Sequence, residues 1–247
     1  MKLIQLITMG LSMCVYSQNR ESLLNKPVNP STLTVFDTLI FYSNLNVLNA
    51  KIGLYETEIG SVFKINDRVF KSSINQYGYL SFKESTFEIS SAQKLTTSID
   101  LGVSLNFHHL YIAESDNYNA LSFNLGIGYK KERFTIYLLL QNPLNASYLE
   151  NDLMSSFIVS SFYYWNENLK SELNVSQSLH LGLNVNHKLS YTYQNKVSCS
   201  IIQGSNPFEY GFNLGYKIKR FQFYSQYNKS SYMQSSGFSI FYTLGDV

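Results

Sequence analysis

The stretch Ile99–Tyr111, which reads IDLGVSLNFHHLY, alternates between two kinds of side chain over thirteen residues. Its odd-numbered positions are apolar or aromatic apart from His109, and its even-numbered positions from Asp100 to His108 are polar or glycine. A period of two places the two sets on opposite faces of a β-strand. A tilted strand of about 9–11 residues crosses a bilayer, so a strand of this length with one apolar face predicts a transmembrane β-barrel.

The same alternation recurs through most of the chain and predicts an all-β fold, a transmembrane antiparallel β-barrel of 14 strands. The count treats Val47–Ile65 as one long strand bent near Gly60, because splitting it gives fifteen and bacterial barrels normally have an even number. The expected strands are Leu33–Ser43, Val47–Ile65, Val69–Phe82, Phe87–Leu95, Ile99–Tyr111, Asn119–Lys130, Phe134–Gln141, Met154–Tyr164, Leu169–Ser176, Leu179–Tyr193, Val197–Gln203, Phe208–Ile218, Arg220–Asn228 and Ser236–Leu244.

The connections between these strands differ in length at the two ends of the expected barrel. Those assigned to the periplasmic end are short, such as Asn66-Asp67 and Lys219. Those at the opposite end include the longer segments Ala113–Tyr118, Asn142–Asp152 and Lys229–Ser235. Short periplasmic turns and longer outer loops are typical of outer-membrane barrels.

The first residues resemble an export sequence. Met1-Lys2 is a short basic start and Leu3–Tyr16 is a mainly apolar run, which together predict a cleaved signal peptide over residues 1–18. Cys14 raises a lipoprotein alternative, which the bulky Met13 before it disfavours. Residues 19–32 have no periodicity and are expected to form an N-terminal periplasmic or plug segment, followed by the barrel domain at 33–247.

Composition narrows the class of protein. The formal net charge of +2 gives no reason to expect nucleic acid as a partner. Twenty tyrosines and seventeen phenylalanines suit the aromatic girdles of a membrane barrel. No run of 18 apolar residues follows the predicted signal peptide, which excludes a helical membrane protein. With Cys14 removed, Cys199 stands alone and no intramolecular disulfide is expected.

No set of residues predicts catalysis, so we expect a protein that is not an enzyme, with no catalytic residue, cofactor site or metal site. His108 and His109 are adjacent on one strand, so their rings point to opposite faces and cannot share a metal. Gly126 and Gly128 are not followed by a helix, so they do not form a phosphate loop. We expect these glycines to leave room inside the barrel or to permit strong bending of the strand.

Several segments in order resemble the Bacteroidetes branch of the FadL-like outer-membrane barrels, the PorV/PorQ type that is associated with type IX secretion. The match covers residues 29–244. Two features depart from the family, namely a shorter chain and an end, Leu244–Val247, without a terminal aromatic residue. The segments that carry the resemblance are Asn29–Leu33, Leu101–Phe107, Leu125–Lys130, Leu140–Pro143, Phe212–Lys217, Tyr224–Tyr227 and Phe238–Leu244.

The resemblance implies a non-enzymatic subunit or scaffold of an envelope complex in the outer membrane of a Gram-negative bacterium, with lipid and other envelope proteins as partners. The alternative is a FadL-like channel for small hydrophobic molecules. The small polar residues Ser122, Asn124, Asn184 and Asn186 on the lumen face disfavour an apolar pocket. A soluble β-sandwich adhesin is a third hypothesis, which would need strands interrupted about every six residues.

One loop offers a candidate contact for a partner protein. Tyr148, Leu149 and Met154 lie in or beside the segment Asn142–Asp152 and form an apolar-aromatic group. We expect this group at the outer rim of the barrel, where exposed apolar side chains mark either a protein contact or an anchor at the membrane interface.

Overall fold

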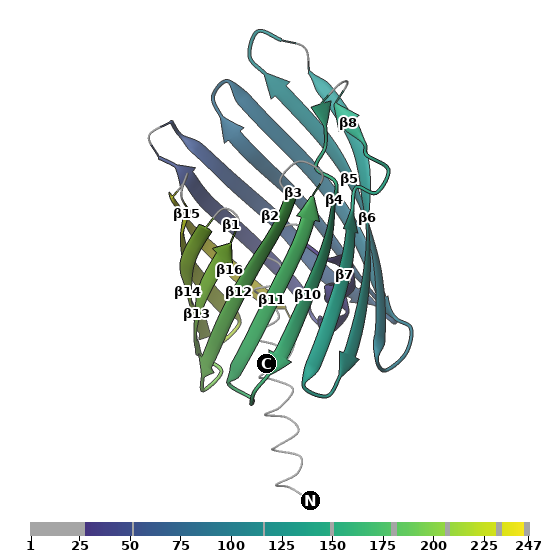
Figure 1. Ribbon diagram of the computed structural model, residues 1–247, viewed down its shortest axis with the longest axis vertical. Helices are drawn as coiled ribbons and strands as arrows, with labels where there is room; N and C mark the ends of the chain where they lie inside the picture. Colours follow the sequence, from purple (N-terminus) through teal and green to yellow (C-terminus); the bar gives the residue numbers. More distant parts are fainter. Residues whose placement is uncertain are drawn as a thin grey trace, which may run out of the picture.

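The computed structural model describes residues 28–50, 52–115, 117–148, 151–178, 182–205, 208–230 and 234–244. The predicted signal peptide at 1–18 lies outside these residues. Fourteen antiparallel strands close into one barrel, and a two-stranded hairpin lies at its rim (Figure 1). The predicted fold class and strand number are therefore confirmed. No helix among the described residues is long and apolar enough to cross a membrane.

The elements follow the chain in simple order. Each barrel strand pairs with its neighbours in sequence, and β1 closes the barrel on β16, with Leu39 opposite Leu244. The elements are η2 (a 3-10 helix, Pro30–Val35), β1 (Leu39–Asn49), β2 (Leu54–Ile65), β3 (Arg68–Tyr79), β4 (Phe82–Lys94), β5 (Ile99–Ile112), β6 (Tyr118–Lys131), β7 (Phe134–Gln141), the hairpin strands β8 (Ser147–Tyr148) and β9 (Asn151–Asp152), β10 (Ser156–Tyr164), β11 (Leu169–Ser178), β12 (Gly182–Tyr193), β13 (Val197–Ser205), β14 (Phe208–Ile218), β15 (Phe221–Ser230) and β16 (Gln234–Leu244).

The alternation of the sequence becomes an inner and an outer face. On β5, Leu101, Val103 and Leu105 are exposed on the outside of the barrel, whereas Asp100 and Ser104 are buried on the inside. An apolar outer face and a polar inner face are the arrangement that a bilayer requires of a barrel. A shift of the strand by one residue would turn every polar side chain toward the lipid, so the pattern also determines the register.

The predicted boundaries near the N-terminus are wrong in two places. The expected strand Val47–Ile65 is divided, since β1 ends at Asn49 and β2 begins at Leu54. The expected break before Val47 does not occur, because Asn44 and Asn46 belong to the polar inner face of β1. The two errors cancel in the strand count. The start of the predicted strand Leu33–Ser43 is the 3-10 helix η2 instead.

The two ends of the barrel differ, as the lengths of the connections predicted. The first strand, β1, begins and the last strand, β16, finishes at the same rim of the barrel. This rim also carries the turn between β2 and β3. The opposite end carries the longest connection among the described strands, which runs between β7 and β10 and contains the hairpin β8–β9. Leu80 and Ser81, at that same end, form a connection of only two residues, so the outer loops are not uniformly long.

Candidate functional site

The described start of the chain lies inside the barrel. The helix η2 packs against β3, β4, β5 and β6, and its residues Pro30–Thr34 are buried. Asn29 begins the helix, because its Oδ1 accepts hydrogen bonds from the Ser31 backbone N at 3.0 Å and the Ser31 Oγ at 2.8 Å. The Asn29 Nδ2 donates to the backbone oxygen of Leu138 on β7 at 2.9 Å. The segment is thus attached to the barrel wall.

Glycines on the inner face provide the space that this segment occupies. A Cβ at Gly102 would overlap the backbone of Pro30 and Ser31, and a Cβ at Gly126 would overlap the side chain of Asn29. Close approach of another backbone is a common reason for glycine within a strand. The expectation that glycines leave room inside the barrel is therefore confirmed for Gly126, where the occupant is the chain's own N-terminal segment, and for Gly128, where it is the Tyr137 ring.

A bulky side chain at Gly126 should expel the segment. The Gly126→Val variant is expected to displace Asn29 from the wall and to raise the ion conductance of the purified barrel in planar bilayers, because the polar lumen then opens to water. Ser161→Val, on the outer face of β10, is the matched control and should conduct like the unchanged protein. A folded Gly126→Val barrel with unchanged conductance would contradict the idea that the segment obstructs the lumen.

An apolar cluster that includes residues of the segment lies at the base of the barrel. Leu33 and Phe36 pack with side chains near the ends of several strands, at the end where β1 begins. The Phe241 ring lies 5.7 Å from the Tyr42 ring and 5.6 Å from the Tyr224 ring, measured between centroids. The remaining members of the cluster are Ile40, Val62, Val69 and Ala92.

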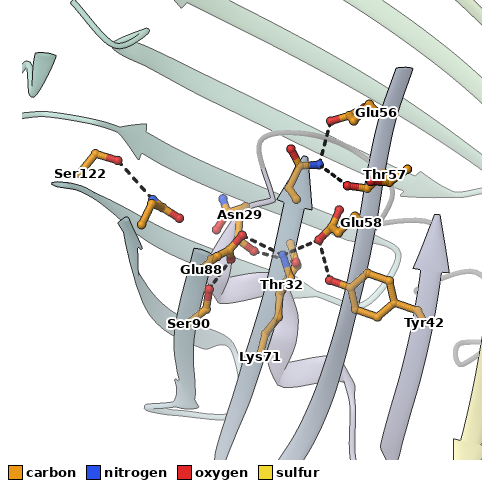
Figure 2. A network of polar contacts seen from close by, with 12 residues as sticks. Asn29, Thr32, Tyr42, Glu56, Thr57, Glu58, Lys71, Glu88, Ser90 and Ser122 are labelled. Atoms are coloured by element: carbon orange, nitrogen blue, oxygen red, sulfur yellow. Dashed lines mark hydrogen bonds and ion pairs between the residues drawn. The ribbon is translucent and has the colours of Figure 1, made fainter. Parts of the chain in front are cut away.

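A buried polar network lies on the inner face of β1 to β4 (Figure 2). The Lys71 Nζ lies 2.9 Å from the Glu88 Oε2 and 3.5 Å from the Glu58 Oε1. The Tyr42 hydroxyl donates to the same Glu58 oxygen at 2.7 Å. Lys71 and Glu58 are only 1% and 2% exposed, so the charges lie away from bulk water and depend on one another.

A second ion pair joins β5 to β6, and its lysine also bonds to the N-terminal segment. Lys130 forms an ion pair with Asp100, and its Nζ also donates to the Thr34 Oγ1 at 3.2 Å. Asp100 is 2% exposed. The helix is therefore attached at both of its ends, through Asn29 at one and Thr34 at the other.

The lumen above the segment contains a cavity of about 720 Å³, which we call chamber 1. It lies against β2 to β6 and the outer loop. Its lining includes the polar side chains Glu58, Lys71, Ser73, Asn75, Glu84, Thr86, Glu88, Asn106, His108, Ser122, Asn124, Gln141 and Asn142, and the apolar or aromatic side chains Val28, Phe82, Leu110, Ile112, Tyr148, Leu153 and Met154. The apolar members lie mainly near the outer ends of the strands and in the loop.

The loop residue Tyr148 bonds to the wall of chamber 1. Its hydroxyl donates to the Glu84 Oε1 at 3.2 Å. Burial, together with the Glu84 carboxylate, raises the pKa of Tyr148 above its usual range, so the hydroxyl stays protonated and remains a donor. His108 lies alongside, with its Nε2 2.8 Å from the Ser122 Oγ and its Nδ1 3.1 Å from the Thr86 Oγ1. The bond between Tyr148 and Glu84 positions the loop over the lumen.

A second cavity of about 450 Å³, which we call chamber 2, lies against β10 to β15. Asn29 and Thr32 of the N-terminal segment contribute to its lining, whereas the preceding residue, Val28, lines chamber 1. Met154 lines both chambers. The segment and Met154 thus contribute to the walls of both chambers.

The three residues expected to contact a partner are placed differently from one another. Tyr148 is 6% exposed and faces the lumen, so the expected exposed position at the rim is wrong for this residue. Met154 is 43% exposed. Leu149 lies outside the described residues. The lumen position of Tyr148 has no signal in the sequence, because β8 is only two residues long and lacks an alternating pattern.

The two adjacent histidines face opposite sides of β5, as the alternation predicts. His108 faces the lumen and His109 faces outward, where its Nδ1 lies 2.9 Å from the Asn119 Oδ1. Among the described residues, no group of three or more histidine, cysteine, aspartate or glutamate side chains could hold a metal ion.

Comparisons with known proteins identify the fold. No protein-family model matches the chain. A search of curated proteins also finds no match. The structure is similar to the P. putida toluene transporter TodX, with a TM-score of 0.66 and 10% identity over 89% of this chain and 93% of that chain. The Ralstonia pickettii toluene transporter TbuX gives 0.66 and 10% over 88% and 92% of the two chains.

A third solved structure, the CymD monoaromatic hydrocarbon channel, has a TM-score of 0.61 and 10% identity over 89% of this chain and 91% of that chain. These likenesses agree, at the level of fold, with the FadL-like part of the resemblance drawn from the sequence. The three proteins are transporters or channels, which agrees with the expectation of a non-enzymatic protein. The comparisons do not support the more specific PorV/PorQ, type IX secretion or Bacteroidetes assignments.

Proposed function

We propose that this protein is an outer-membrane channel for small hydrophobic molecules, and that chamber 1 is where such a molecule first binds. The observation that carries the proposal is the apolar outer part of this chamber, which includes Phe82, Leu110 and Ile112 and is bordered by Leu153 of the outer loop. Its volume of about 720 Å³ lies within the usual range for small-molecule sites, roughly 300–1,000 Å³. The fold shared with hydrocarbon transporters supports the same proposal.

The apolar cluster at the base of the barrel favours a gated channel over an open pore. The cluster around Leu33 and Phe36 packs against β1 to β4, β15 and β16, and the segment that carries these residues is attached to the wall through Asn29. Passage from chamber 1 to the periplasm then requires this segment to move. Its attachment combines the hydrogen bonds of Asn29 and Thr34 with the apolar packing of Leu33 and Phe36, and none of these is a hydrogen bond between barrel strands, so the segment can move without unfolding the strands.

The subunit or scaffold role expected first from the sequence stays a prediction. The comparisons favour the channel, because the similar structures are named as transporters and a channel. A contact between the outer loop and another envelope protein also stays a prediction. Of the described residues expected to form it, Met154 is exposed, but its side chain lines both chambers.

A polar side chain in the apolar part of chamber 1 should impair uptake. Leu110 is 8% exposed and lies on the inner face of β5, so Leu110→Gln keeps the approximate size of the side chain while removing apolar surface. We expect uptake of subsaturating toluene by cells that express the variant to fall about tenfold, equivalent to about 1.4 kcal/mol of lost binding. The measurement is uptake of radiolabelled toluene at equal levels of folded barrel.

The matched control is Leu144→Gln in the outer loop, where the leucine is 75% exposed and does not line chamber 1. It should take up toluene like the unchanged protein. If uptake in cells expressing the unchanged barrel is no faster than in cells without it, the proposed function is wrong. If Leu110→Gln and the unchanged protein take up toluene equally, the assignment of the binding site to chamber 1 is wrong.

A further inference from the structure

Chamber 2 is lined by amide side chains from several strands. Asn174 of β11, Asn184 and Asn186 of β12, Asn213 of β14 and Asn228 of β15 all contribute to its lining. Each primary amide offers two N–H donors and one carbonyl acceptor. A neutral surface with many donors and acceptors complements a ligand that also has both.

Three of these amides have a carbonyl oxygen that accepts no hydrogen bond within the described part of the chain. The Oδ1 atoms of Asn184, Asn186 and Asn213 are buried and accept no hydrogen bond from a described residue. Asn213 as a whole is only 9% exposed. Buried polar atoms normally have partners, because an unsatisfied one costs about 1–3 kcal/mol. Rotation about χ2 exchanges the amide oxygen and nitrogen, so either can face the chamber.

Glycines determine where two of these amides lie. A Cβ at Gly204 of β13 would overlap the Asn186 side chain, and a Cβ at Gly211 of β14 would overlap that of Asn228. Each asparagine therefore occupies space that a missing side chain on a neighbouring strand leaves open. Such an arrangement limits the motion of the amides before a ligand arrives, which reduces the entropic cost of binding.

The charged side chains of the lining are two carboxylates, Glu172 and Glu209, and one ammonium group, Lys188, so the balance of charge is negative and disfavours an anion. Glu172, which is 3% exposed, accepts a hydrogen bond from the Asn174 Nδ2 at 2.8 Å, and Glu209 also lines the chamber. An aromatic surface lies beside the amides, where Tyr137 and Phe162 meet edge to face with centroids 5.7 Å apart. The chamber thus combines many neutral hydrogen-bonding groups, two carboxylates, the ammonium group of Lys188 and an aromatic surface.

We propose that chamber 2 is a binding site for a neutral polyhydroxylated molecule, of the size of a mono- or disaccharide. A hydroxyl both donates and accepts, so several hydroxyls on one ligand satisfy the Asn184, Asn186 and Asn213 oxygens and the amide N–H groups together. The volume of about 450 Å³ is suitable for a small ligand. This site is separate from chamber 1 and does not rest on the proposed uptake of hydrophobic molecules.

The test is titration calorimetry of the purified full-length barrel with sucrose and with maltose as probes. The detergent is a sugar-free amine oxide, because glucoside and maltoside detergents carry the proposed ligand chemistry. We expect saturable binding of at least one probe to the unchanged protein. Asn213→Leu and Asn186→Leu keep similar side-chain volumes but remove the amide, and each should weaken binding about tenfold or more.

Asn119→Leu is the matched control, since Asn119 lies on the outer face of β6 and does not line chamber 2. It should bind the probes like the unchanged protein. Heat-modifiable migration on a gel checks the fold of every variant, and Asn186→Leu carries the test if Asn213→Leu does not fold. Absence of saturable binding of both probes, or an equal loss in Asn119→Leu, would overturn the proposal.

The outcomes for the two chambers are distinguishable. Toluene uptake without sugar binding would leave the channel proposal in place and overturn the site in chamber 2. Sugar binding that is lost in Asn213→Leu, without toluene uptake, would do the reverse. Addition of dodecyl maltoside during the titration should compete with the probe, since its headgroup belongs to the same chemical class.

Discussion

Replacement of Lys71 by methionine is expected to destabilise the barrel by about 3–5 kcal/mol. The lysine is the cation between the carboxylates of Glu58 and Glu88, and its side chain is 1% exposed. Methionine fills much of the same space but leaves two negative charges facing one another in the lumen wall. Removal of one partner from a buried ion pair is costly because the remaining charge has lost both water and its counterion. Denaturant titration of the barrel refolded in lipid vesicles measures the loss.

The control for this prediction neutralises the whole network. The triple variant Lys71→Met, Glu58→Gln and Glu88→Gln removes both the cation and the carboxylates, and the amide oxygen introduced by Glu58→Gln can still accept from the Tyr42 hydroxyl. It should recover most of the stability lost in Lys71→Met. If Lys71→Met unfolds at the same denaturant concentration as the unchanged protein, the network does not contribute to stability in the way we infer.

The inner and outer faces of the barrel could be predicted from the sequence because the information is local. A membrane strand has lipid on one side and the lumen on the other, so neighbouring residues face opposite environments. Their side-chain types therefore show which face each one occupies. The stretch Ile99–Tyr111 shows this most clearly, with Leu105 outside and Ser104 inside as expected. The same rule placed His108 in the lumen and His109 on the outer face.

The contents of the lumen could not be predicted in the same way. The hydrogen bond from Asn29 to Leu138 joins residues 109 positions apart, and no pattern along one strand encodes it. The apolar base was missed for a related reason. Inner-face positions were expected to be polar, whereas Val62 and Phe241 point inward and pack beneath the N-terminal segment.

The lumen-facing residues named from the sequence are polar as expected, but the cavity that they line also has apolar walls. Ser122 and Asn124 do face inward and line chamber 1, and small polar residues of this kind were expected to disfavour an apolar pocket. The same chamber also includes Leu110 and Leu153, the latter from the outer loop. A strand pattern gives the face of each residue but not its neighbours across the lumen, so it could not show that polar and apolar walls enclose one cavity.

The observed start of β12 at Gly182 changes the choice of lipid-facing residue for a substitution that tests whether the barrel spans a bilayer. The strand expected at Leu179–Tyr193 would have placed Leu183 well inside the bilayer. In the structure Ser178 pairs with Gly182, so the connection between the strands is short and Leu183 lies near the outer end of β12. The cost of a charge on the lipid face falls toward the interfaces. Leu105, near the middle of β5, is the better position.

The Leu105→Arg variant is therefore expected to destabilise the barrel by about 2–4 kcal/mol, the cost of arginine near the bilayer midplane. Leu105 is 51% exposed on the outer face, between Val103 and Phe107, which are also exposed. Leu144→Arg makes the same substitution in the outer loop and should cost little, because its leucine is 75% exposed outside the strands. Denaturant titration in lipid vesicles measures both variants. Equal stability of the two would mean that this face of β5 does not contact the hydrocarbon core, whereas a loss confined to Leu105→Arg is what a barrel embedded through its apolar outer face requires.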